Sequence, residues 1–168
     1  MKVRSDTITL DALDWSILEL LQSNSNQTYT AMGHQLRVAH STIYERIKKM
    51  EEQGVIKKYT VTVDLGKMGK KPVTAIMTVF ADPKEIEDVA KKLAEMKEAV
   101  EVDTSLSEEL LIIAKVVAED QEKLHEFIAQ KVVPLAGVLR IRTSIVTKKF
   151  KEGEFQIGYL KYARYFYK

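Results

Sequence analysis

The stretch AHSTIYERIKKMEEQGVIKKYTVTVD, residues 39–64, predicts a short amphipathic helix that ends at a glycine and leads into a strand. Ile43, Ile47 and Met50 recur at i, i+4 and i+7, which gives one apolar stripe with a 3.6-residue period. Gly54 stands where a helix normally needs a left-handed residue to end. Beyond it, apolar and polar residues alternate over 55–64, the pattern of a strand with one apolar face.

The polar face of this helix is small, hydroxyl-rich and basic, and it carries Ser41, Thr42, Glu45, Lys48 and Lys49. A DNA major groove accepts a helix with such a face, backed here by a β-wing that carries lysines. A solvated surface helix is the alternative interpretation. The segments on either side favour the first.

Composition excludes several classes of protein. The 168 residues carry a net charge of +2 and contain no cysteine, so a disulfide scaffold and a thiolate zinc site are both excluded. His34, His40 and His125 are too scattered to predict a metal site, and no cofactor is expected. We find no apolar run as long as a membrane span and no charged-then-apolar leader, which predicts a cytoplasmic protein without membrane contact.

Charge is distributed unevenly along the chain. Residues 1–64 hold eight bases and eight acids, residues 82–131 hold seven bases and fourteen acids, and residues 132–168 hold eight bases and two acids. Contact with nucleic acid is therefore expected only on particular surfaces, because the acidic centre would repel phosphate.

The N-terminal region predicts a DNA-binding domain over residues 1–64. Apolar periodicity indicates a first helix over residues 10–23, and Thr28 or Thr30 is placed to cap a second helix that runs through Leu36. With the helix and strand of residues 39–64, these elements make a winged helix-turn-helix. Glycine, proline and lysine residues over 65–72 indicate a linker.

Residues 73–149 predict an α+β domain with the order βαββαβ. Strands are expected over 73–81, 100–106, 110–117 and 138–148, with helices near 86–97 and 124–132. This order is typical of a ferredoxin-like sheet with both helices on one face. A second copy of the chain is the simplest cover for the other face, so we expect a homodimer.

In this order and spacing, the sequence resembles the Lrp/AsnC (feast/famine) family of transcriptional regulators over residues 10–149. The resemblance rests on Leu10-Asp11-x-x-Asp14 with Ile17-Leu18, on residues 41–51 (STIYERIKKME), on Gly54-Val55-Ile56 with Tyr59, and on Gly137-Val138-x-Arg140-x-x-Thr143. It implies a sequence-specific, DNA-binding regulator of prokaryotic transcription with a ferredoxin-like, ACT-like RAM domain. It also implies binding of an amino acid or another small metabolite, and assembly to a dimer and often to an octamer.

Two departures from the family pattern affect the expected sites. Arg37-Val38-Ala39 replaces the usual Gly-Leu-Ser, so the next helix either takes its cap from Ser41 or begins uncapped at His40. In the effector region, Ser107-Glu108-Glu109 replaces the usual glycine and aspartate, which makes a free amino acid less favoured as the effector. The candidate effector residues are Ser105, Ser107, Glu108, Glu109 and Thr143.

Ten residues are candidates for contact with double-stranded DNA: His40, Ser41, Thr42, Tyr44, Glu45, Arg46, Lys48, Lys49, Lys57 and Lys58. Hydroxyl groups can reach base edges or phosphates, and lysines most simply meet phosphates. Glu45 either accepts from a cytosine amine or pairs with Lys48 or Lys49.

Besides Glu45, four more of the ten have open alternatives. Tyr44 either bonds a phosphate or covers the core, and Arg46 has a phosphate role, favoured by the family resemblance, or is a plain surface arginine. Lys57 and Lys58 either contact phosphate or protect an edge strand from aggregation.

Residues 150–168 form a C-terminal extension rich in aromatic residues, for which packing against the sheet or a neighbouring subunit is the favoured role.

Two other functions are considered. Some siroheme decarboxylases share the two-domain plan, but their aromatic, histidine-bearing motif has no counterpart in residues 72–82, so we expect no enzyme. An architectural DNA-binding protein without an effector is the other alternative.

Overall fold

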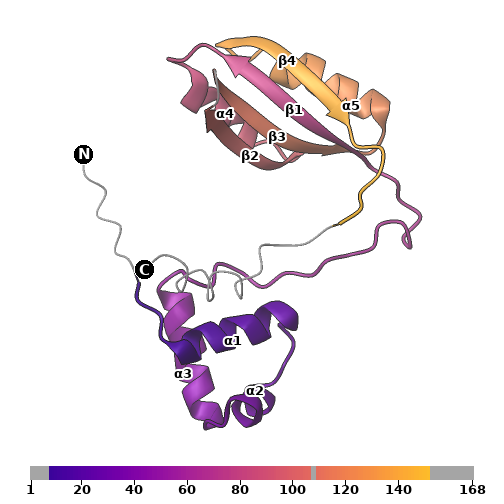
Figure 1. The fold of residues 1–168 in the computed structure, drawn as a ribbon. Helices are drawn as coiled ribbons and strands as arrows, with labels where there is room; N and C mark the ends of the chain where they lie inside the picture. Colours follow the sequence, from indigo (N-terminus) through magenta and orange to yellow (C-terminus); the bar gives the residue numbers. More distant parts are fainter. Residues whose placement is uncertain (1–7, 107–108, 152–168) are drawn as a thin grey trace. The chain divides into compact units, whose positions relative to one another are not determined.

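The computed structural model describes residues 8–106 and 109–151, which form two compact units that divide between Thr62 and Val63 (Figure 1). Ser107, Glu108 and nearly all of the C-terminal extension lie outside the described residues, so the predictions made for them stay predictions.

Three helices form the first unit, as predicted: α1 (Ala12–Ser23), α2 (Tyr29–Leu36) and α3 (His40–Glu52). The helices enclose a small core in which Ile17, Met32, Ile43, Ile47 and Met50 are at most 1% exposed. Asp11 and Asp14 form a capping box at the start of α1, and the Thr28 hydroxyl accepts from the Ala31 N–H at 3.1 Å at the start of α2. Local hydrogen bonds therefore begin α2 at the predicted cap Thr28, whereas α1 begins at Ala12, two residues after the predicted start.

The strand predicted after α3 is not formed. Gly54 does end the helix region with a φ of +70°, as expected, but residues 55–64 lie outside any strand of the described chain. A strand needs a second strand beside it to accept its hydrogen bonds, and no strand of the described residues pairs with this segment. Val61 is 81% exposed, which indicates that this segment also lacks an apolar cover.

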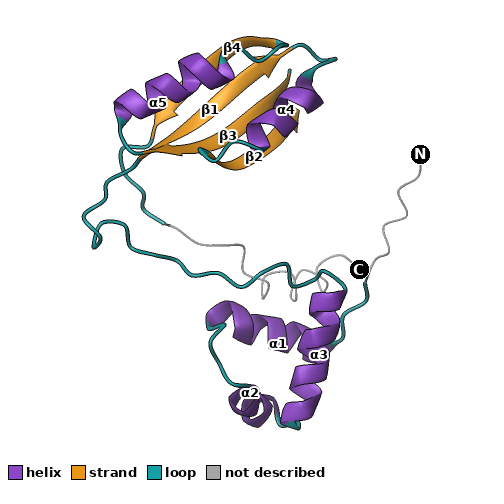
Figure 2. Cartoon of the chain, turned by 180° about the vertical axis from the view of Figure 1, so that it is seen from behind, coloured by secondary structure: helices purple, strands orange, loops and turns teal. Residues whose placement is uncertain are grey.

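The second unit has the predicted ferredoxin-like order. Its elements are β1 (Val73–Ala81), α4 (Ile86–Ala94), β2 (Ala99–Leu106), β3 (Leu110–Ala118), α5 (Gln121–Phe127) with one π-turn (Ile128–Val132), and β4 (Val138–Ile145). The strands pair antiparallel in the order β2-β3-β1-β4. Both helices cover one face of this sheet (Figures 1 and 2), and the core lies beneath them.

The opposite face of the sheet has no cover within the described chain, and its charges are sorted by strand. Cross-strand pairing places Asp103, Ile113, Thr78 and Arg142 in one row across the four strands. Glu101 and Asp103 lie on the β2 edge, whereas Arg140 and Arg142 lie on the β4 edge, next to the Phe80 ring at 3.9 and 5.7 Å. This face is therefore acidic at one edge and basic at the other.

Candidate nucleic-acid interface

The turn between α2 and α3 is tight, and one glycine makes it possible. The Val38 N–H donates to the Gly33 carbonyl at 3.0 Å, which folds the chain back over the end of α2. A Cβ on Gly33 would lie 2.7 Å from the Val38 carbonyl oxygen, too close for any side chain. Arg37 then takes a left-handed conformation, with φ 58° and ψ 42°, where most residues are disfavoured.

α3 begins without a side-chain cap. Its N-cap residue is Ala39, which has no side-chain oxygen, and the helix begins at His40. The second of the two alternatives for this helix is therefore confirmed, and a cap by Ser41 is wrong. Because the missing cap falls where the family pattern has serine, the replaced Gly-Leu-Ser turn explains it.

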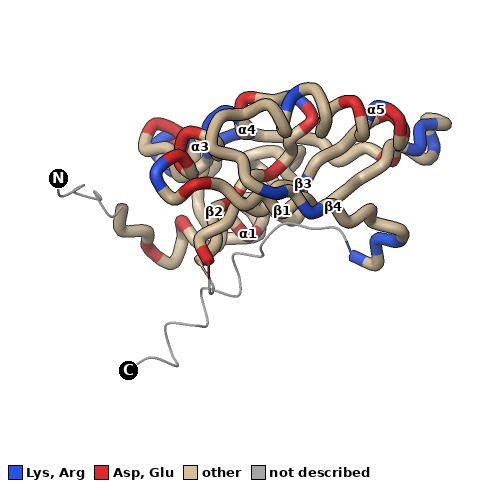
Figure 3. Tube along the Cα trace, turned by 90° about the horizontal axis from the view of Figure 1, so that it is seen from above, with Lys and Arg blue, Asp and Glu red and all other residues tan. Residues whose placement is uncertain are grey.

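The outward face of α3 has the predicted residues. Ile43, Ile47 and Met50 are buried against α1 and α2, so the opposite side of the helix faces solvent. On that side Ser41, Tyr44, Glu45, Lys48, Lys49 and His40 are exposed and Thr42 is half-buried. Acidic and basic residues occur together along this helix (Figure 3). The face therefore offers hydroxyl, carboxylate and ammonium groups to a ligand.

The ion pairs on this face differ from the salt bridge expected between Glu45 and Lys48 or Lys49. Lys48 pairs with Glu52, at 3.8 Å between Nζ and Oε1, and not with Glu45. Within the described residues, Glu45 and Lys49 form no ion pair. The salt-bridge interpretation of Glu45 is therefore wrong, and its carboxylate is free to accept from another molecule.

Arg46 does not share this face. Its guanidinium contacts the carboxylates of Asp11 and Asp14 at the start of α1, with 3.0 Å between Nη1 and the Asp14 Oδ1. Asp14 is 7% exposed, so this pair holds a nearly buried carboxylate. The backbone N–H of Asp14, followed by the Arg46 side chain, lowers the pKa of Asp11 below its usual value. In this position Arg46 joins α3 to α1.

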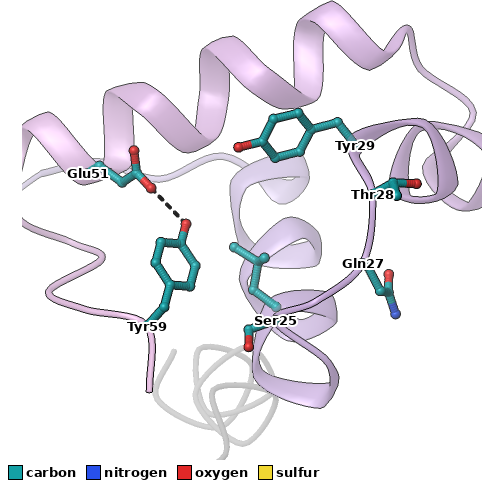
Figure 4. Close-up of a pocket in the computed structure, with 7 residues that line it drawn as sticks. Ser25, Gln27, Thr28, Tyr29, Glu51 and Tyr59 are labelled. Atoms are coloured by element: carbon teal, nitrogen blue, oxygen red, sulfur yellow. Dashed lines mark hydrogen bonds between the residues drawn. The ribbon is translucent and has the colours of Figure 1, made fainter. Parts of the chain in front are cut away.

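Aromatic side chains line a hollow of about 420 Å³ beside α3 (Figure 4). Tyr59 donates from its hydroxyl to Glu51 at 2.8 Å, and burial, followed by the Glu51 hydrogen bond, raises the pKa of Tyr59 to about 12. Tyr29, at the start of α2, points into the same hollow, and its ring centre lies 5.8 Å from that of Tyr44. Tyr44 thus packs against an aromatic partner but stays 48% exposed, so it both covers α2 and remains open to a ligand.

Lys57 and Lys58 lie in the segment that follows α3, where both side chains are exposed. They line a second hollow, of about 610 Å³, with residues at the end of α1. Because this segment forms no strand in the described chain, their alternative role as edge-strand lysines is wrong. Contact with phosphate stays a prediction.

Of the candidate effector residues that the structure describes, Ser105 and Glu109 lie at the end of β2 and just before β3, whereas Thr143 lies apart from them. Ser105 lies on β2 opposite Leu111, on the bare face, whereas Thr143 lies on β4 opposite Met77, which faces the helices. Three strand spacings, roughly 14 Å at about 4.8 Å each, separate these edge strands. A site that uses both Ser105 and Thr143 would need one of them from another copy.

Two other classes of site are tested by the geometry. In the part of the chain that the structure describes, no three His, Cys, Asp or Glu residues gather where they could hold a metal ion. Within the same residues, none of the helices is both long enough and apolar enough to cross a membrane.

Family models match both units of the chain. The AsnC-type helix-turn-helix domain matches residues 10–51, and the Lrp/AsnC ligand binding domain matches residues 74–154. The chain is 30% identical over 145 residues to the HTH-type transcriptional regulator Ptr1 of Methanocaldococcus jannaschii, a match that covers 86% of this chain and 96% of that protein. It is 31% identical over 142 residues to the HTH-type transcriptional regulator LrpA of Pyrococcus horikoshii, with 84% and 99% covered.

Solved structures share the fold. E. coli AsnC superposes with a TM-score of 0.79 at 23% identity, and the match covers 89% of this chain and 99% of that chain. A transcriptional regulator of Neisseria meningitidis, solved in complex with L-Met, superposes with a TM-score of 0.75 at 22% identity, over 86% and 94% of the two chains. Both units of the fold therefore occur together in these regulators.

Proposed function

The chain belongs to the Lrp/AsnC family of DNA-binding transcriptional regulators, and from that premise we propose that the exposed face of α3 reads the DNA major groove. The observation that supports this most directly is the division of α3 into a buried apolar stripe and an open polar face. A helix-turn-helix consists of two helices, here α2 and α3. The later helix of the motif lies in the groove, and the earlier one crosses the sugar–phosphate backbone.

Two parts of this face have different roles in the proposal. Ser41, Thr42 and Glu45 occupy the first half of α3, which reaches deepest into the groove, so they contact base edges. Lys48 and Lys49 lie in the second half and contact phosphates, which gives affinity but little sequence preference. Glu45 would accept from the amine of a cytosine, because its carboxylate has no partner in the described chain.

Arg46 has a positioning role in this proposal. Its guanidinium is engaged with Asp11 and Asp14, so contact with phosphate would break two ion pairs. By holding α3 against the start of α1, Arg46 sets the angle at which the exposed face is presented.

We also propose that two copies associate through the bare faces of their sheets. A two-fold axis parallel to the strands would place β4 of one copy over β2 of the other. The basic edge would then face the acidic edge, with Arg142 near Asp103 of the partner subunit, because both residues lie in one row. A two-fold axis that lies in the plane of the sheets but perpendicular to the strands would instead place each edge strand over its own copy, so that like charges meet. The dimer would present two α3 helices to half-sites separated by about one helical turn, roughly 34 Å, or a multiple of it.

Regulation by an amino acid is a further part of the proposal, and so is a cytoplasmic location beside the chromosome. A regulator of the same fold was solved with L-Met, which supports an amino acid as the class of effector. Ser105 and Thr143 would act in different copies, because one chain keeps them on opposite edges and faces. Assembly beyond the dimer stays a prediction.

The test of the DNA-binding face is the double change Lys48→Ala with Lys49→Ala. Loss of two ammonium groups should weaken binding to specific and random duplexes alike, and should reduce the dependence of affinity on salt. Fluorescence anisotropy titrations at several salt concentrations measure both quantities. Lys91→Ala with Lys92→Ala is the matched control, since it removes two adjacent exposed lysines from α4 in the other unit.

Unchanged affinity for DNA in the variant that lacks Lys48 and Lys49, with intact folding, would show that the exposed face of α3 is not the DNA-binding face. Equal affinity of the natural chain for every duplex would instead favour an architectural DNA-binding protein. Tight binding of a tetrapyrrole, followed by its absorbance, would favour the siroheme-decarboxylase alternative. These three readouts are independent of one another.

A further inference from the structure

We propose that Arg37, in the turn between α2 and α3, is a dedicated anchor for a DNA phosphate. This inference rests on the proposed function. It adds a DNA contact from a residue that lies before α3 and therefore outside the exposed face of that helix. The ligand class is a phosphodiester of the duplex backbone, and the contact is independent of sequence.

The first observation is the backbone conformation. Among the described residues, Arg37 alone combines a positive φ with a side chain; the other positive values belong to Gly54, Gly69 and Gly137. A left-handed arginine is disfavoured because its Cβ lies too close to its own carbonyl oxygen, and glycine would relieve this strain. The chain therefore keeps an arginine at a position where it costs stability.

The second observation is that nothing inside the described chain offsets this cost. The Arg37 side chain is exposed, and no ion pair, side-chain hydrogen bond or aromatic contact of the described residues involves it. Only its backbone N–H is used, as a donor to the Gly33 carbonyl. A strained, exposed side chain without a partner among the described residues indicates a partner in another molecule.

The third observation is the distribution of charge. Arg37 is the only lysine or arginine between residues 5 and 45, a range that contains α1, α2 and the start of α3. The lysines of α3 lie at the other end of that helix, at positions 48 and 49. A cation at each end of the recognition helix would neutralise phosphates on both sides of the groove contact and add affinity at each. Within the described residues, Arg37 is the only permanently charged cation in the turn before α3.

Position explains why the partner is phosphate. When the first half of α3 enters the groove, the residues just before the helix lie at the rim, beside the sugar–phosphate backbone. Arg37 precedes the first residue of α3 by three positions. A guanidinium there can donate two parallel hydrogen bonds to a phosphate, a geometry that an ammonium group cannot reproduce.

The experiment compares three substitutions in the full-length chain. Arg37→Gly removes the charge and the strain, Arg37→Gln removes the charge but keeps a side chain in the left-handed position, and Arg37→Lys keeps the charge. Lys92→Gln, an exposed residue of α4, is the control for loss of one charge elsewhere. Affinity for one specific and one random duplex is measured across a salt series, and thermal unfolding is followed by the fluorescence of Trp15, the only tryptophan.

The Gly and Gln variants should both weaken binding about tenfold at low salt, equally for specific and random duplexes, and the slope of log affinity against log salt should fall by roughly 1 per bound protomer. The Gly variant should unfold no earlier than the natural chain. Affinity and slope unchanged in both variants would overturn the proposal, and so would a loss confined to the specific duplex. Failure of the natural chain to bind any duplex would overturn the proposed function itself.

Discussion

At the scale of single residues, the turn before α3 departs from the family pattern twice, with separate consequences. Arg37 occupies a left-handed position that glycine tolerates better, and Ala39 occupies a cap position that serine would satisfy. Both replacements reduce the local stability of the helix-turn-helix. The first adds an exposed cation beside the proposed DNA face, whereas nothing in the structure explains the second.

Ala39→Ser should therefore stabilise the first unit by about 1 kcal/mol, because a hydroxyl there can accept from the backbone N–H of the first turn of α3. Residue 39 already has the extended conformation of a cap, with φ −63° and ψ 146°, so no rearrangement is needed. Denaturant unfolding followed by Trp15 fluorescence reports on this unit, since Trp15 lies in α1.

Thr28→Ala is the matched opposite change, because the Thr28 hydroxyl accepts from the Ala31 N–H at 3.1 Å in the same unit. It should lower the free energy of unfolding by a similar amount, about 1 kcal/mol. If Ala39→Ser were neutral while Thr28→Ala destabilised, the first turn of α3 would have no need of a cap.

At the scale of elements, the contact between α3 and α1 determines how the DNA face is held. Arg46 links two carboxylates of the α1 capping box to the middle of α3. The pKa of Asp11 is lowered by the Asp14 backbone N–H first and by Arg46 next. A carboxyl group with a lowered pKa stabilises the folded state at any pH above its unfolded value, and this stabilisation disappears as the pH falls through the folded value.

Asp11→Asn should reveal this pH dependence. Asparagine is as good an N-cap as aspartate, so the change removes the charge and keeps the cap. The natural chain should be more stable than the variant at pH 7, and the difference should shrink as the pH falls below the ordinary aspartate value of 3.8. Trp15 fluorescence across a pH series of denaturant titrations measures the difference; a gap that stayed constant down to about pH 2 would contradict the role of the Asp11 charge.

Most elements could be predicted from sequence, because local periodicity and capping determine where they begin and end. β1 matches its prediction residue for residue, and the first four helices begin and end within a few positions of theirs. The strand after α3 was wrong, since an alternating pattern shows which face is apolar but not whether a partner strand exists. The contact of the Arg46 side chain with α1 was also unpredictable. A stripe of period 3.6 shows which face of a helix is buried, but it does not specify which neighbouring element a residue at the edge of that stripe contacts.

At the scale of the whole molecule, the sorted charges on the bare face of the sheet make the proposed dimer testable. Arg142→Glu should weaken association, because it places a carboxylate opposite Asp103 of the partner subunit. Asp103→Arg added to this variant should restore the dimer with its charges exchanged. Sedimentation at several protein concentrations measures the dissociation constant.

The helix side of the same sheet offers the control, since Lys92→Glu reverses a charge on exposed α4 and should leave association unchanged. Dissociation by Arg142→Glu without rescue by Asp103→Arg would rule out the axis parallel to the strands. Both substitutions keep the sheet core intact, because Asp103 and Arg142 lie on the uncovered face.

The most direct measurement is selection of bound sequences from a pool of random duplexes with the full-length chain. A dimer that reads DNA with two α3 helices should enrich a nearly palindromic site whose half-sites lie about 10 base pairs apart, or a multiple of that spacing. The same selection with Glu45→Ala should relax the preference at one position of each half-site, which would identify α3 as the reading element. A pool that stays random after several rounds, despite retained duplex, would contradict sequence-specific recognition by this chain.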